Sequence, residues 1–165
     1  MTAPTIDDVP TRASYRALFG AVAVGTFALD QLTKAWARSA LETRDVDVVW
    51  TLRFHLTVNH AAAFSLGAGF GAWIAVIAVV VVGVLVWKGR SVDSRVGAIA
   101  LGLIVGGALG NVFDRLVHSD GGFLSGGVTD FIDLQWWPVF NVADIAVVCG
   151  AILLAITFLR SPEAR

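Results

Sequence analysis

Two aspartates in the last third of the chain have the residue type and the surroundings for acid–base chemistry. Asp130 and Asp144 lie on either side of a Trp pair and a proline, and neither has a Lys or Arg at helical spacing. Two carboxylates that face each other share one proton, so one serves as base and the other as acid. A water molecule between them is deprotonated for attack on a carbonyl while the protonated partner polarises that carbonyl. This pair therefore predicts the mechanism of an aspartic peptidase.

Other catalytic chemistries have weaker support in the sequence. His55, His60 and His118 lack the spacing of metal ligands. Ser65 and Ser125 have no His or Lys placed in an obvious dyad, so a serine mechanism has little support. Because a pair of carboxylates activates water without a metal or a covalent intermediate, we expect no metal and no other cofactor.

The composition places these residues in a membrane. Of 165 residues, 56% are hydrophobic and 15% are charged, and the mean hydropathy is +0.74, which is more apolar than a soluble domain of this size can bury. Four apolar segments are long enough, or nearly so, to cross about 30 Å of hydrocarbon. They predict an all-α integral membrane protein with four transmembrane helices, at about 16–38, 68–88, 95–114 and 139–160. We expect one domain, 15–160, after a disordered cytoplasmic tail, 1–14.

The distribution of Lys and Arg predicts which side of the membrane each loop faces. Basic residues precede the first helix, fill the short link between the second and third, and follow the fourth: Arg12, Arg16, Lys88, Arg90, Arg95, Arg160 and Arg165. Both termini are therefore expected in the cytoplasm. The net charge of -1 is uninformative about partners, and without a basic or aromatic stripe we expect no nucleic-acid partner.

The two segments expected on the outer side carry strand patterns. Residues 51–58 alternate apolar and polar side chains, and residues 131–136 do so more weakly. This alternation predicts a small extracytoplasmic β-sheet, with its apolar face towards lipid or substrate. Residues 116–129 contain several glycines without a regular pattern, which predicts a mobile flap over the site.

The polar residues that interrupt the apolar segments are expected at one depth, near the outer ends of the helices. Ionisable groups inside a membrane cost at least about 2.5–3.5 kcal/mol each, so their convergence indicates a functional site. The set comprises Asp30, Lys34, Asn59, Asn111, Asp114, Arg115, Asp130, Asn141 and Asp144. For Asp30, Lys34 and Asp114 a structural role remains open, with Asp30 paired to Lys34 and Asp114 to Arg115 or another neighbour.

Four sequence blocks together resemble the lipoprotein signal peptidases, the type II signal peptidases of bacteria. The blocks are DQLTK (30–34), NHAAAFSL (59–66), GALGNVFDR (107–115), and the pair GVTDF (127–131) and FNVADI (140–145). Each block alone is a weak signal, but their order and their places at helix ends are specific. The resemblance covers nearly all of residues 17–159. One departure is Ala61, where the family usually has Gly, a residue that adopts positive φ without strain.

The resemblance implies an aspartic endopeptidase of the bacterial cytoplasmic membrane, with an active site near the extracytoplasmic face and a fold of four helices and a small β-cradle. Its partners would be membrane lipids and lipidated prolipoproteins, whose signal peptide is cut before a diacylglyceryl-modified cysteine. Carried over by position, the catalytic residues are Asp130 and Asp144. The residues implied to shape the site and hold substrate are Asp30, Lys34, Asn59, Asn111, Asp114, Arg115 and Asn141. We expect a monomer.

Two other functions fit part of the sequence. A small proton- or ion-coupled membrane transporter would also carry intramembrane Asp residues, but it would need polar residues leading to the cytoplasmic face, and the inner halves of the last three helices offer almost none. A non-catalytic scaffold that binds lipidated peptides would keep the groove and tolerate Asn in place of either Asp130 or Asp144.

Overall fold

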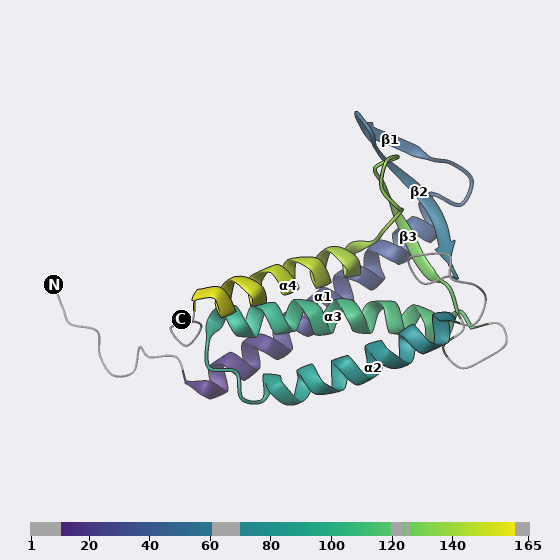
Figure 1. Cartoon of the computed structure of the whole chain (residues 1–165). Coiled ribbons are helices and arrows are strands. Elements are labelled where there is room, and N and C mark those ends of the chain that lie inside the picture. The colour runs from purple at the N-terminus through teal and green to yellow at the C-terminus, as the bar shows by residue number, and fades with distance from the viewer. Residues whose placement is uncertain (1–10, 61–69, 120–123, 125, 161–165) are drawn as a thin grey trace.

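The computed structural model describes residues 11–60, 70–119, 124 and 126–160. Four helices lie along one another, and three strands form a small sheet that stands across one end of them (Figure 1). The elements are α1 (Arg12–Ala40), β1 (Val46–Val49), β2 (Leu52–Asn59), α2 (Phe70–Gly89), α3 (Arg95–Val117), β3 (Val128–Asp133) and α4 (Val142–Arg160). We call the end of the helices that carries the sheet the sheet end.

The first helix begins earlier than the sequence predicts. Thr11 is its N-cap, and the Thr11 hydroxyl accepts a hydrogen bond from the Ser14 N–H at 3.4 Å. This cap satisfies one of the amide groups that a helix leaves unpaired at its start. The prediction of a disordered tail is therefore wrong for residues 12–14, while residues 1–10 lie outside the described part of the chain.

The last helix begins three residues later than predicted. Val139 and Phe140 begin the last apolar segment, but Phe140 forms a β-bridge with Ile132 of β3. The Phe140 N–H donates to the Ile132 carbonyl at 3.1 Å, and the Ile132 N–H donates to the Phe140 carbonyl at 2.9 Å. Because these backbone groups are used in the bridge, the chain is extended there and α4 starts at Val142.

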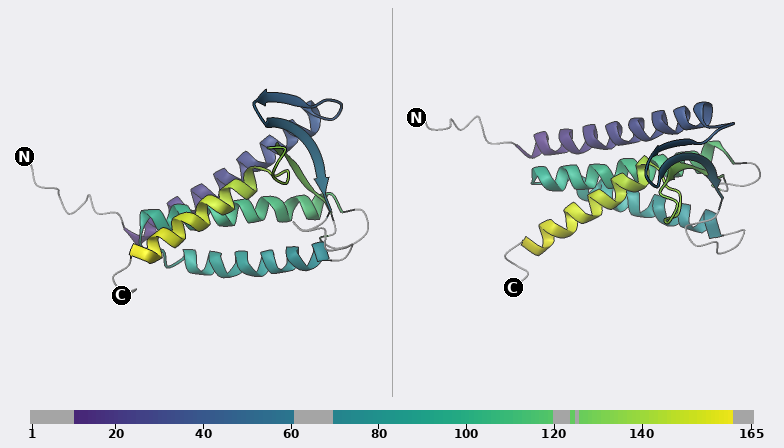
Figure 2. Two further views of the ribbon diagram at one scale, coloured as in Figure 1. Left: turned by 45° about the horizontal axis from the view of Figure 1, so that its top comes forward. Right: turned by 90° about the horizontal axis from the view of Figure 1, so that it is seen from above.

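Helix α3 lies at the centre of the bundle and packs along α1, α4 and α2 (Figures 1 and 2). Its glycines allow α1 to approach closely. A side chain at Gly102 would meet Val22, one at Gly106 would meet the Ala23 carbonyl, and one at Gly110 would meet the Asp30 carboxylate. Small residues at this spacing bring two helix backbones together, and here they also leave room for a buried acid between α1 and α3.

The sheet is antiparallel, in the order β1-β2-β3. The pairing of β2 with β3 places Thr57 opposite Asp130. The predicted strand is present as β2, but its burial does not alternate: every residue is half-buried except Val58, which is exposed. Phe54 and Leu56 pack with Phe131 on the sheet end of α1, and the Phe54 ring meets the Trp36 ring edge to face at 5.3 Å. This packing fastens β3 to the helices that surround it.

Among the described residues, two helices are long and apolar enough to cross a membrane, Arg95–Val117 and Val142–Leu159, and Val76–Gly89 is a shorter apolar helix. Helix α1 contains Asp30 and Lys34, and neither side chain is exposed on the surface of the molecule. These two charges therefore point into the protein, where a surrounding bilayer would not meet them.

Candidate active site

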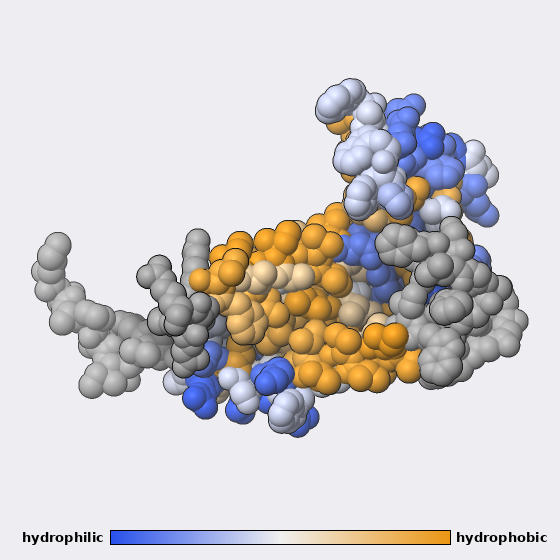
Figure 3. All heavy atoms as spheres, viewed as in Figure 1, coloured by the Kyte–Doolittle hydropathy of each residue, from blue (hydrophilic) through white to orange (hydrophobic). Residues whose placement is uncertain are grey.

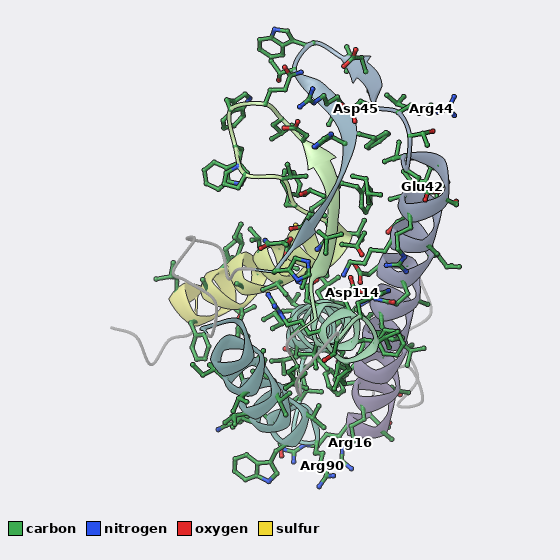
Figure 4. All side chains as sticks on the ribbon, turned by 90° about the vertical axis from the view of Figure 1, so that its right-hand side faces the viewer. Arg16, Glu42, Arg44, Asp45, Arg90 and Asp114 are labelled. Atoms are coloured by element: carbon green, nitrogen blue, oxygen red, sulfur yellow. The ribbon has the colours of Figure 1, made fainter. Side chains whose placement is uncertain are left out.

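Buried polar side chains gather where β3 meets α1, α3 and α4, and Lys34 lies at the centre of this cluster. Its side chain is 0% exposed. The Lys34 Nζ lies 2.9 Å from Asp30 Oδ2, 3.3 Å from Asp114 Oδ2 and 2.9 Å from Asn111 Oδ1. An ammonium group has three N–H donors and no acceptor, so these three oxygens use its full capacity. Viewed from the sheet end, Asp114 lies over α3, between α1 and α4 (Figure 4).

The contact with Lys34 fixes which way the Asn111 amide points. Because Lys34 only donates, the Asn111 oxygen faces Lys34 and its Nδ2 faces the other way. That nitrogen donates to Asp144 Oδ1 at 2.9 Å. Asn111 thus connects the buried lysine with the carboxylate of Asp144 on the neighbouring helix. Asp144 itself is only half-buried.

Asn141 joins the two predicted catalytic residues. It is the N-cap of α4: its Oδ1 accepts from the Asp144 N–H at 3.0 Å, and its own N–H donates to Asp144 Oδ2 at 3.2 Å. This reciprocal pair is a capping box, which satisfies two backbone donors at a helix start. The Asn141 Nδ2 also donates to Asp130 Oδ1 at 2.6 Å. One fully buried residue therefore positions both carboxylates, Asp130 through its side-chain amide and Asp144 through its backbone N–H.

Asp130 is buried on β3, and its environment favours the protonated form. Its second oxygen accepts from Asn59 Nδ2 at 3.2 Å. Burial, and then the negative charge of nearby Asp144, raise the pKa of Asp130 to about 6, against the opposing effects of Asn59, Asn141 and Lys34. A carboxyl group with this pKa exchanges its proton near neutral pH, as an acid–base pair requires.

The remaining predicted residues support the same cluster, with one correction. Asp30 pairs with Lys34 as predicted, and its Oδ1 accepts the Ala143 N–H of α4 at 3.0 Å. The predicted pair of Asp114 with Arg115 is wrong: the cation at Asp114 is Lys34. Arg115 donates to the Gly126 carbonyl at 3.2 Å instead. Adjacent residues on a helix point in different directions, so Asp114 faces α1 and Arg115 faces the segment before β3.

The described residues between α3 and β3 show that the predicted flap, 116–129, is shorter than expected. Residues 116–117 belong to α3 and residues 128–129 to β3, so neither pair is free to act as a flap. Leu124 is buried, and the Gly126 N–H donates to the Arg115 carbonyl at 3.1 Å. Residues 120–123 and 125 lie outside the described part, as does Ala61.

Three residues of the cluster were missed by the sequence analysis. The Gln31 Nε2 donates to Asp30 Oδ2, to the Gly110 carbonyl and to Asp114 Oδ1, at 3.0, 3.2 and 3.3 Å. Thr129 gives its N–H to Asp114 Oδ2 at 2.9 Å, and its hydroxyl accepts from Arg38 Nη1 at 2.8 Å. Gln31 was visible as a polar residue beside Asp30 in an apolar segment, and Thr129 lies in the GVTDF block, whereas no sequence signal separates Arg38 from surface residues.

The cluster is open on one side of the molecule. A pocket of about 350 Å³ borders Asp130 and is lined by Thr57, Val58, Asn59, His60, Asp130, Pro138 and Val139. In Figure 3, hydrophilic atoms are visible at the sheet end between the apolar surfaces of α4, above, and α2, below. A separate pocket of about 360 Å³ between α1 and α3 has an apolar lining without groups for acid–base chemistry. We therefore place the site at the pocket beside Asp130.

Comparison with known proteins gives one consistent result. The family model described as signal peptidase (SPase) II matches residues 22–160. A lipoprotein signal peptidase of Rhodococcus jostii is 41% identical over 156 residues, 93% of this chain and 78% of the relative. One from Syntrophomonas wolfei is 42% identical over 135 residues, 79% of this chain and 85% of the relative.

Two solved structures share the fold. Both are described as a bacterial membrane enzyme determined by the in meso method, one at 2.3 Å and one at 1.9 Å resolution. They have TM-scores of 0.72 and 0.71 and 27% sequence identity to this chain. The alignments cover 84% and 85% of this chain and 85% and 91% of the solved chains.

Proposed function

The chain belongs to the signal peptidase II family, and from this premise we propose that Asp130 and Asp144 together hydrolyse the bond between a signal peptide and a lipidated cysteine. Membership makes the chain a bacterial membrane protease of the aspartic type whose activity is the removal of signal peptides from prolipoproteins. The transporter considered from the sequence has no support in these relatives. The single observation that carries the catalytic assignment is the Asn141 side chain and backbone, which hold both carboxylates at once.

The surroundings of the two carboxylates support different roles for them. Asp130 is buried, and its pKa is raised to about 6, so it keeps its proton at pH values below about 6. Asp144 receives N–H donors on both oxygens, and the positive end of the α4 dipole stabilises a negative charge there. We therefore assign the proton of the resting pair to Asp130 and the charge to Asp144.

Hydrolysis then proceeds by proton transfers at these two side chains. Asp144 takes a proton from a water molecule, whose oxygen attacks the carbonyl carbon of the scissile bond. Asp130 gives its proton to the carbonyl oxygen, so charge does not build up on the tetrahedral intermediate. As the intermediate collapses, Asp130 takes back a proton from one of its two hydroxyl groups, the C–N bond breaks, and the proton held by Asp144 passes to the leaving nitrogen.

We infer that all four helices cross the cytoplasmic membrane and that the sheet end faces outwards. The basic residues Arg12, Arg16, Lys88, Arg90 and Arg95 belong to the helix ends and link opposite the sheet (Figure 1), which supports a cytoplasmic position for that end. The buried ion pairs of α1 remove the main obstacle to its insertion.

The proposed path of the signal peptide runs along the exposed apolar sides of α2 and α4. Helix α2 packs against α3, and the sides of α2 and α4 carry exposed apolar residues such as Val80 and Ile152. A signal peptide is an apolar segment, so it lies along such apolar surfaces without losing contact with hydrocarbon. Its C-terminal end then reaches the polar cluster at the sheet end, where the scissile bond is cut.

The proposed substrate class is tested by comparing cleavage of a precursor with and without the lipid on its cysteine. The purified protein in lipid bilayers is incubated with a prolipoprotein that bears diacylglycerol and with the same precursor without it. Each buried CH₂ group is worth about 0.8 kcal/mol, so loss of the acyl chains lowers kcat/KM by more than about tenfold. Equal cleavage of the two precursors would retain a peptidase but refute the requirement for lipid.

The assignment of the proton to Asp130 predicts a shift in the pH profile. The kcat/KM of the wild type falls as pH rises through about 6, because Asp130 loses the proton that it donates. Removal of the hydrogen bond from Asn59, in Asn59→Ala, destabilises the ionised form, raises the pKa of Asp130 and moves the fall to higher pH. The expected shift is up to about one pH unit.

A matched change just before β1 controls for a general electrostatic effect. Asp45→Asn removes a charge that binds His55. It should leave unchanged the pH at which kcat/KM falls. A shift to lower pH in Asn59→Ala, or no shift at all, would contradict the assignment of the proton to Asp130.

A further inference from the structure

Three tryptophans at the free end of the sheet are exposed far beyond what the fold requires. Trp50 in the β1–β2 turn is 97% exposed, and Trp136 and Trp137 in the loop after β3 are 69% and 59% exposed. We call these three residues the Trp tip. Tryptophan is rarely left so exposed in water, because it has a large apolar surface, and contiguous exposed apolar groups mark interaction sites.

A hydrogen bond between the two loops and a contact between two rings hold the Trp tip together. The Gln135 Nε2 donates to the Thr51 carbonyl at 3.1 Å, which ties the loop after β3 to the β1–β2 turn. The Trp136 and Trp137 rings meet edge to face with centroids 6.2 Å apart. Trp50 and Gln135 have φ of 54° and 65°, a left-handed conformation that is rare for residues with a large side chain. A bulky aromatic residue at such a turn points to a role for the side chain outside the fold.

The direction of the hairpin places the Trp tip beside the helices and not beyond them. In Figure 1 and in both views of Figure 2, the end of the β1–β2 hairpin bends back until it is level with the first turn of α4 along the bundle. The sheet ends of α1, α2 and α3 reach further than this level. The Trp tip therefore lies at the depth where α4 begins, on the side of the molecule and clear of the helices.

The charges around the Trp tip are mixed and do not form a surface for an anionic partner. Asp45 and Asp133 bind Arg53. Asp45 also lies 2.8 Å from the His55 ring. Because Arg53 is paired with these two acids, the described residues of the tip offer aromatic surface and not a patch of unpaired positive charge. Indole rings with these properties concentrate at the boundary between lipid headgroups and hydrocarbon.

We propose that the Trp tip inserts into the outer headgroup region of the bilayer and anchors the sheet that carries Asp130 to the membrane surface. The partner is the lipid surface itself, continuous with the apolar belt of the helices. Because β2 pairs with β3, a hairpin fixed at its tip limits the movement of β3 relative to α4. The proposal rests on the inferred position of the sheet end at the outer membrane surface, and it does not depend on which residues catalyse hydrolysis.

The test uses a fluorescent label beside the tip in the full chain. The lone cysteine is removed by Cys149→Ala, and Val49→Cys, at an exposed position next to Trp50, is labelled with an environment-sensitive nitrobenzoxadiazole dye. The protein is reconstituted in vesicles of phosphatidylcholine. We expect blue-shifted emission, and quenching by aqueous iodide several-fold weaker than for the same dye at Arg44→Cys, an exposed residue on the far side of the sheet (Figure 4).

Variants of the tip separate lipid insertion from other causes of protection. Changing Trp50, Trp136 and Trp137 together to Ala exposes the dye to iodide, while changing them to Tyr retains protection because that ring is also amphipathic. Addition of anionic phosphatidylglycerol has little effect. Iodide quenching at position 49 as strong as at position 44 would overturn the proposal. Protection that survives the triple Ala change, or that requires anionic lipid or an added protein, would overturn it as well.

Discussion

Replacing either Asp130 or Asp144 by asparagine is expected to lower kcat for prolipoprotein cleavage by about 10²- to 10⁴-fold, the usual contribution of one positioned acid or base. Asparagine keeps the shape of the side chain and still accepts a hydrogen bond, so the contacts with Asn141 are largely retained. It cannot take up or release a proton at these pH values. The loss should therefore fall on kcat, with KM little changed. Rates of cleavage of a lipidated precursor measure both quantities.

The double variant Asp130→Asn with Asp144→Asn gives a sharper result. Because the two side chains act as one unit on one water molecule, the double variant should lose about as much activity as either single variant, not the product of the two losses. Asp133→Asn is the matched control, since Asp133 is on the same strand and binds Arg53 at 2.6 Å. Wild-type cleavage by either single variant would refute the dyad and favour a scaffold that binds lipidated peptides.

Lys34→Met is expected to lower the free energy of unfolding by about 3–5 kcal/mol, the cost of removing one partner from a buried ion pair. The change leaves Asp30 and Asp114 buried without their cation. It also frees the Asn111 amide to turn, so that its nitrogen is no longer directed at Asp144. Activity should fall together with stability, although Lys34 touches neither catalytic carboxylate. Denaturant unfolding in detergent and cleavage assays measure the two effects.

Lys88→Met is the matched control for this prediction. Lys88 is the other lysine of the chain, and it is exposed at the end of α2, so its loss should change stability by no more than about 0.5 kcal/mol. Adding Asp114→Asn to Lys34→Met removes one unpaired charge and should recover part of the lost stability. Equal stability of Lys34→Met and Lys88→Met would mean that the cluster does not depend on its central cation.

The sequence alone determined the parts of this protein that depend on local pattern. Apolar segments predict the four helices to within a few residues at most ends, and alternation predicts β2, because a helix or a strand must present one kind of side chain at its own period. The polar residues of the site stood out for a related reason: Asp30, Lys34 and Asp144 interrupt segments that are otherwise apolar, and such interruptions are costly in a membrane. Among the acids expected at the depth of the site, Asp30 and Asp114 had Lys34 and Arg115 as expected partners, which left Asp130 and Asp144 without a cation.

Only the tertiary structure decided which of these side chains meet. Asp114 is adjacent to Arg115 in sequence but pairs with Lys34 on another helix, and the orientation of Asn111 follows from that lysine. The start of α4 was set by a bridge to β3, and the Trp tip by a hydrogen bond between two loops. Each of these contacts joins residues far apart in the chain, so the relative placement of packed helices and paired strands determines it, and no local pattern of residues encodes that placement.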